Sequence, residues 1–155
     1  MKRHWILFAL LVVPAGLWAQ NRSSDQLADL LNGHQIERVE ILHVSDTLET
    51  PIRITPETIR QLARYKVAVE KPWELSSFPT LVTGVKEIGR AATRNPGEVR
   101  WVIVFFDDAG KERSAIFLSR DGKIGIFDGA SLTLPTTLLD WSRRLIRSAF
   151  LEGAK

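Results

Sequence analysis

Cysteine is absent from all 155 residues of this sequence, which excludes disulfide bonds and any site built on a thiol. Small exported domains of eukaryotes commonly contain disulfides, whereas an exported domain without cysteine must be stabilised by its hydrophobic core. A chain of this length can bury one ordinary core. If the chain is exported, the absence of cysteine therefore favours a bacterial protein.

A large excess of charge of one sign is also absent. The chain has 21 Lys and Arg against 18 Asp and Glu, and Lys2 and Arg3 lie in an N-terminal segment that we expect to be removed. The remaining 19 basic and 18 acidic residues give a net charge of +1. This balance does not support nucleic-acid binding, and we predict no nucleic-acid partner.

Established catalytic motifs and metal-ligand clusters are missing as well. The sequence contains no G-x-S-x-G motif and no S-x-x-K motif with its partners. Beyond the N-terminal segment the histidines are His34 and His43, which are nine residues apart and have no companion ligands at a suitable spacing. Structural roles are expected for both, and we predict no catalytic residues, no cofactor and no metal site.

Four aspartates in the C-terminal half raise the possibility of a carboxylate pair for glycoside hydrolysis. They are Asp107, Asp108, Asp121 and Asp128. Each lies beside a glycine or at the end of a predicted strand, where Asp is favoured for turn geometry alone. Turn roles are the preferred interpretation, and a hydrolase of an envelope polymer is kept as the second alternative function.

The N-terminus has the features of an export signal. Basic residues at positions 2–4 precede an uncharged, mostly apolar run from Trp5 to Leu17, and the small residue Ala19 follows. The run is shorter than the roughly 20 residues that a membrane-spanning helix needs. We expect residues 1–19 to be a Sec-type signal peptide that is cleaved after Ala19. This predicts a periplasmic or extracellular protein without a stable membrane span, and an uncleaved anchor is the alternative.

Residues 20–155 are interpreted as a single domain that mixes helices and strands. Helical patterns cover about 24–32, 55–64, 80–93 and 137–150. Strand patterns cover about 36–44, 48–54, 65–69, 101–106, 114–119 and 123–127. The expected class is α+β, in which a mostly antiparallel sheet with a C-terminal three-strand meander packs against three to four helices.

Three local signals carry most of this prediction. The run from Trp101 to Phe106 is apolar without alternation, which indicates a central strand covered on both faces. Asp121-Gly122 indicates a hairpin turn. Thr55-Pro56-Glu57 has the capping hydroxyl, proline and acid that are typical of a helix start.

Two groups of residues are candidates for a ligand or partner surface. Arg143, Arg144 and Arg147 lie opposite the apolar stripe of the last predicted helix, where an ordinary solvated face is the competing interpretation. Trp73 and Phe78 lie in the loop at 70–79, and large aromatic residues are common at interfaces but also cover cores.

These observations leave three functions open. The first is a non-enzymatic exported domain that binds another envelope or secreted protein, as an inhibitor, an immunity-type protein or an accessory factor. The alternative is a small-ligand carrier or sensor in the envelope, with a pocket under the loop at 70–79. The polymer hydrolase is the third. The oligomeric state is not predicted.

Overall fold

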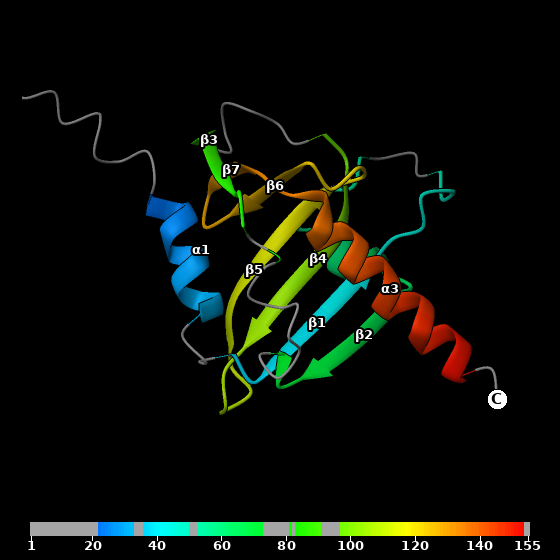
Figure 1. Ribbon diagram of the computed structural model, residues 1–155. Coiled ribbons are helices and arrows are strands. Elements are labelled where there is room, and N and C mark those ends of the chain that lie inside the picture. The colour runs from blue at the N-terminus through cyan, green and yellow to red at the C-terminus, as the bar shows by residue number, and fades with distance from the viewer. Residues whose placement is uncertain are drawn as a thin grey trace, which may run out of the picture.

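The computed structural model describes residues 22–32, 36–49, 53–72, 81, 83–90 and 97–153 (Figure 1). The helices within these ranges are α1 (Arg22–Asn32), α2 (Ile59–Leu62) and α3 (Thr136–Gly153). The strands are β1 (Arg38–His43), β2 (Tyr65–Glu70), β3 (Lys86–Arg90), β4 (Val99–Phe106), β5 (Glu112–Ser119), β6 (Ile124–Phe127) and β7 (Ala130–Thr133). The predicted signal peptide at 1–19 lies outside the described residues and stays a prediction.

The described strands form one sheet in the order β2-β1-β4-β5-β6-β7-β3. All neighbouring strands are antiparallel. The predicted α+β class and the antiparallel sheet are confirmed, with a sheet that is larger than predicted and three helices among the described residues. Four consecutive strands, β4 to β7, form the meander for which three were expected.

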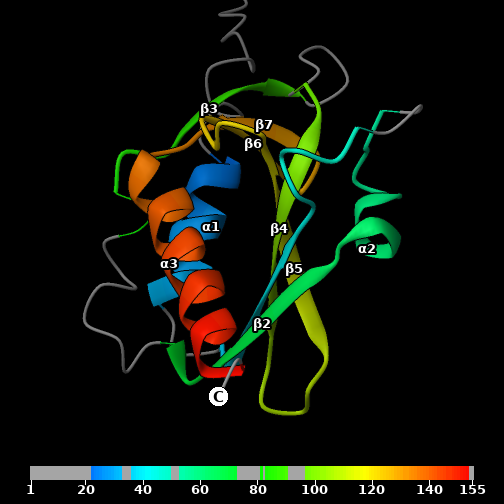
Figure 2. The same cartoon turned by 90° about the vertical axis from the view of Figure 1, so that its right-hand side faces the viewer.

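Helices cover the two faces of the sheet unequally. In Figure 2, α1 and α3 lie together against one face, and the short α2 lies on the other. Along β4, Trp101, Ile103 and Phe105 belong to the larger core under α1 and α3. Val102 and Val104 belong to the smaller core on the α2 side. The prediction of a central strand buried on both faces is therefore confirmed.

Burial on both faces also explains why apolar and polar residues alternate only imperfectly along β1. Val39 and Ile41 are fully buried in the larger core. Leu42 packs against the smaller core on the opposite face, and Val44, which follows the strand, is part of that core. Because both faces of this strand contact apolar neighbours, its sequence does not alternate cleanly between apolar and polar residues.

The helix predicted over about 80–93 is wrong, because part of this range forms β3. This strand lies at the edge of the sheet and pairs with β7, with an irregularity between Glu87 and Gly89. Gly84 and Gly89 have φ values of 91° and 136°, which an α-helix does not allow. The apolar spacing in this range resembled a helix, but the glycines decide the backbone.

The strand predicted at 48–54 is also wrong in its described part, and the helix predicted at 55–64 is shorter than expected. Residues 48, 49, 53 and 54 lie outside every strand. The expected helix start at Thr55 is a turn, in which the Thr55 backbone N–H donates to the Thr58 hydroxyl at 3.0 Å. The helix begins only after Thr58, and its buried residue Ile59 contributes to the smaller core.

One strand of the meander, β7, was missed by the sequence analysis. It follows a two-residue turn, Asp128-Gly129, because Phe127 pairs directly with Ala130. Both turn residues have positive φ, 47° and 72°. Asp-Gly is the pair that such a turn favours, so the signal was present in the sequence.

Candidate functional site

A concave feature lined by described residues lies where α3 crosses the end of the sheet near its β2 edge. Strand β1 ends at His43, which pairs with Tyr65 at the start of β2 and with Trp101 near the start of β4. Directly opposed residues of neighbouring strands project from the same face of the sheet. The antiparallel register therefore places three aromatic or imidazole rings in a row beneath α3.

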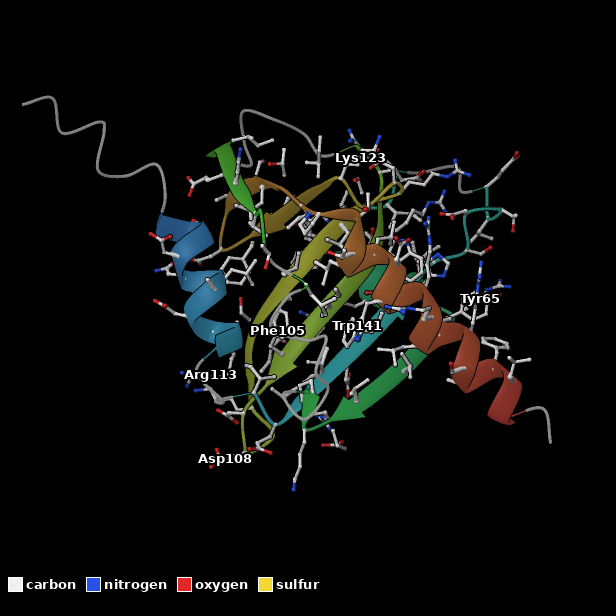
Figure 3. All side chains as sticks on the ribbon, in the orientation of Figure 1. Tyr65, Phe105, Asp108, Arg113, Lys123 and Trp141 are labelled. Carbon is white, nitrogen blue, oxygen red and sulfur yellow. The ribbon has the colours of Figure 1, made fainter. Side chains whose placement is uncertain are left out.

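Side chains of α3 complete this feature on its other side. Arg143, Arg147 and Phe150 of the helix face His43, Tyr65 and Trp101 of the sheet around an open cavity of about 560 Å³. We call this cavity the α3 groove. Figure 3 shows Tyr65 beside the helix at this edge of the molecule.

The rings stack along the row. The ring centres of His43 and Trp101 are 3.7 Å apart with an interplanar angle of 16°. Those of His43 and Tyr65 are 5.7 Å apart at 24°. The Phe150 ring lies edge-on to the Tyr65 ring, with 4.9 Å between the ring centres, so the helix contacts the row of rings. This arrangement gives the groove an ordered aromatic floor.

Two nitrogen atoms of this floor lack hydrogen-bond partners. They are the Nε1 of Trp101 and the Nε2 of His43, and both are buried without a partner within the described part of the chain. Trp101 is only 2% exposed. Because an unsatisfied buried polar group costs about 1–3 kcal/mol, such groups in a folded protein need an explanation.

Burial also changes the acidity of the His43 imidazole. Its pKa is lowered, chiefly because burial disfavours the charged form, and the positive charges of Arg143 and Arg100 lower it further. The carboxylate of Asp46 acts in the opposite direction. The imidazole therefore stays neutral to a lower pH than a free histidine does.

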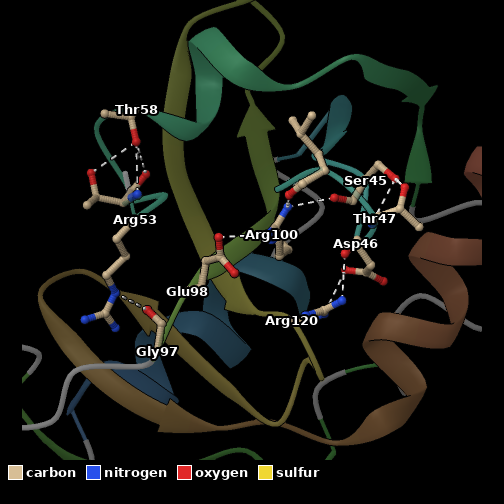
Figure 4. Close-up of polar contacts among 11 residues, drawn as sticks. Ser45, Asp46, Thr47, Arg53, Thr58, Gly97, Glu98, Arg100 and Arg120 are labelled. Carbon is tan, nitrogen blue, oxygen red and sulfur yellow. Dashed lines mark hydrogen bonds and ion pairs between the residues drawn. The ribbon is translucent and has the colours of Figure 1, made fainter. Parts of the chain in front are cut away.

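A buried arginine fixes the loop that forms one wall of the groove. Arg100 is 3% exposed, and its guanidinium donates to the backbone oxygens of Ser45 and Leu48 at 2.7 and 3.0 Å (Figure 4). It also pairs with Glu98 at 2.7 Å. These contacts hold the loop after β1 in place and explain why it does not continue as a strand.

Charges around the groove are unbalanced. Arg143 and Arg147 are four residues apart and so share one face of α3. Arg143 lies 3.8 Å from Asp140, and Arg147 makes no ion pair with any described residue. Asp46 is the one acidic side chain among the described residues that line the groove.

That acidic residue is itself engaged by a base outside the groove. The Nε atom of Arg120 lies 3.7 Å from the Asp46 carboxylate. A terminal nitrogen of the same guanidinium donates to the Asp46 backbone oxygen at 2.6 Å. The charge that remains for a ligand is therefore positive.

The five residues predicted to form a ligand or partner surface do not all lie at the groove. Arg143 and Arg147 line the groove, whereas Arg144 is exposed and is not among its lining residues. Trp73 and Phe78 lie outside the described residues, as does most of the loop at 70–79. The five residues therefore do not form one described surface.

Sequence analysis missed the floor of the groove. His43 was assigned a structural role, and neither Tyr65 nor Trp101 was singled out. The register of the three strands places these rings side by side, and no pattern within a single strand shows that register. His34 lies outside the described residues, and no cluster of three or more metal-binding side chains occurs in the part that the structure describes.

The four aspartates occupy the three successive turns of the meander, with Asp107 and Asp108 in the same turn. Asp107 and Asp108 follow β4, and Asp107 accepts a hydrogen bond from the Lys111 backbone at 2.8 Å. Asp121 follows β5 and accepts one from the Ser119 hydroxyl at 2.7 Å, which lowers its pKa. Asp128 is in the β6–β7 turn. These contacts are those of turn-forming residues.

A search for membrane-spanning helices and comparisons with known proteins complete the description. None of the described helices is long and apolar enough to cross a membrane. Comparison with protein-family models, with curated proteins and with solved structures finds no match to this chain.

Proposed function

We propose that this protein binds a small ligand in the α3 groove and acts as an exported carrier or sensor. The observation that carries the proposal is the aromatic floor with its unpartnered buried nitrogens at the base of a cavity of about 560 Å³. Pockets for small molecules commonly measure roughly 300–1,000 Å³ and combine apolar walls with a few convergent polar groups. The groove meets this description and lies at the Tyr65 end of β2, whereas most of the loop at 70–79, under which a pocket was predicted, lies outside the described residues.

Two features of the walls support binding by a preformed site. Arg100 fixes the loop that carries Ser45 and Asp46, so this wall needs little ordering when a ligand enters. The row of rings is held by the register of three paired strands. A site on such a framework loses less conformational entropy on binding than a site on unsupported loops.

A thermal-shift screen of the purified protein against small molecules of varied charge tests the proposal, together with native mass spectrometry for molecules that co-purify. Phe150→Ala removes a groove wall at a residue that is 58% exposed, so the fold should tolerate it. Arg144→Ala, on the same helix but not lining the groove, is the matched control. A ligand lost in the first variant and kept in the second supports the proposal, and the absence of any ligand contradicts it.

Binding of another protein is the second candidate, and exposed apolar residues favour it. Phe150 and Leu151 are 58% and 73% exposed at the end of α3. Large apolar residues that remain in contact with water are frequent in interfaces. If a protein captured from envelope extract binds the wild type but not a Leu151→Asp variant, this function gains support over small-ligand binding.

A further inference from the structure

We propose that the ligand of the α3 groove is an apolar monocarboxylate, an organic acid with one carboxylate group and an aromatic or hydrocarbon body. This inference rests on the proposed function and adds the chemical class of the ligand. Aromatic acids and fatty acids share this chemistry, and the experiment below distinguishes them.

The charge of the groove selects for an anion. Arg147 has no ion-pair partner among the described residues, and Arg143 has only a long contact of 3.8 Å with the exposed Asp140. The Asp46 carboxylate lies 3.7 Å from Arg120, and its Oδ1 accepts no hydrogen bond from a described residue, so one negative charge in the groove stands against the two arginines. A guanidinium group binds a carboxylate through two parallel hydrogen bonds, so a single carboxylate can pair fully with Arg147.

The floor is also complementary to an acid. Because His43 stacks on Trp101 and Tyr65 along the direction from strand to strand, the three ring planes stand upright on the sheet. Their edges, not their faces, then point away from the sheet toward α3. Ring edges carry partial positive charge, and the unpartnered Nε1–H of Trp101 is a hydrogen-bond donor without an acceptor. The partial positive charge of these edges attracts carboxylate oxygens.

The remaining wall requires an apolar body. Ile146, Phe150 and Leu151 lie next to the arginines on the same helix and line the groove. The last two are largely exposed, and covering them with a ligand removes apolar surface from water. A small inorganic anion would pair with the arginines but leave this surface uncovered, so the full groove fits an acid with a sizeable apolar part.

Isothermal titration calorimetry with matched acids and alcohols tests this inference. Naphthylacetate is compared with naphthylethanol, and octanoate with octanol, at neutral pH and low salt. We expect each acid that binds to do so at least about tenfold more tightly than its alcohol, since a charge-assisted pair is among the stronger hydrogen bonds. Binding of the naphthyl acid alone identifies an aromatic ligand, and binding of octanoate alone identifies a fatty acid; both results support the inference.

Two exposed arginines of α3 supply the matched variants. Arg147→Gln should weaken acid binding about tenfold and leave alcohol binding unchanged, because it removes the charge and the paired donors. Arg144→Gln removes the same charge outside the groove and should leave the preference for acids intact. Melting temperatures equal to that of the wild type would show that neither change disturbs the fold.

The outcomes distinguish a wrong ligand class from a wrong proposed function. If alcohols or a cationic naphthylmethylamine bind as tightly as the acids, or if Arg147→Gln leaves acid binding unchanged, the ligand class is wrong and ligand binding stands. If no compound of any charge binds, in this assay or in the screen, both the ligand class and the proposed function fail.

Discussion

Replacement of Arg100 by Met should destabilise the protein far more than the same replacement at Arg60. Both arginines form short ion pairs, Arg100 with Glu98 at 2.7 Å and Arg60 with Glu112 at 2.6 Å. They differ in burial, since the Arg100 side chain is 4% exposed and the Arg60 side chain is 40% exposed. They also differ in their partners, since Arg100 additionally donates to two backbone oxygens and Arg60 donates only to the Glu112 carboxylate.

The expected magnitudes follow from the partners that each substitution leaves behind. Without Arg100, the half-buried loop loses two hydrogen bonds from a charged donor, those to the oxygens of Ser45 and Leu48. Such bonds contribute roughly 1.5–3 kcal/mol each, and part of this is regained when water reaches the loop. We expect a loss of about 3 kcal/mol in the free energy of unfolding. For Arg60 we expect less than about 1 kcal/mol, because water solvates both exposed partners.

Urea denaturation followed by circular dichroism measures both values. Met retains most of the apolar volume of the arginine stem, so the difference should reflect the polar contacts and not a cavity. Equal losses for the two variants, or a loss below about 1 kcal/mol for Arg100→Met, would refute the reasoning that this guanidinium holds the loop after β1.

Three further predictions concern other parts of the molecule. Because burial lowers the pKa of His43, the unfolded chain binds more protons than the folded one between the two pKa values. Stability should therefore fall as the pH drops below about 6.5, and His43→Gln should reduce this loss when urea curves at pH 7 and pH 5 are compared; equal pH dependence of both proteins would contradict it. Gly122→Ala should cost about 1–3 kcal/mol more than Gly110→Ala in the same assay. The φ values match, at 69° and 71°, but a Cβ at Gly122 would lie 2.6 Å from the Leu139 side chain, whereas one at Gly110 meets no atom within 4 Å; equal losses would show that Leu139 moves aside freely. Asp46→Asn should strengthen binding of the acids in calorimetry about two- to fivefold and leave the alcohols unchanged, because it removes a nearby negative charge. Unchanged acid affinity would show that Arg120 already neutralises this carboxylate.

The parts of the fold that were predicted correctly are those whose sequence pattern lies within one segment of the chain. The unbroken apolar run of β4 and the apolar stripe of α3 each identify an element without reference to the rest of the chain. The incorrect parts depend on distant contacts. β3 forms because β7 provides a pairing edge and two glycines prevent a helix, and the loop at 44–49 stays out of the sheet because Arg100 binds its carbonyl oxygens.

The groove depends even more on distant contacts. His43, Tyr65 and Trp101 come from three separate strands, and only the register of those strands brings their rings together. Single-strand patterns show which face a side chain occupies, but not which residue of a neighbouring strand lies opposite. The arginines of α3 were identified from the helical pattern alone. Which of them line the groove and which face solvent depends on how the helix lies on the sheet.

The location of α3 relative to the sheet edge explains why a groove exists here at all. The helix begins above the interior of the sheet, where Leu138 and Trp141 are buried, and its C-terminal part reaches the edge strand β2 (Figure 1). Beyond β2 the described sheet has no further strand to cover the apolar residues of the helix. Phe150 and Leu151 therefore remain exposed beside the upright rings of the floor. The exposed apolar end of α3 and the cavity beneath it thus have one structural cause, the end of the sheet under a helix that still carries an apolar stripe.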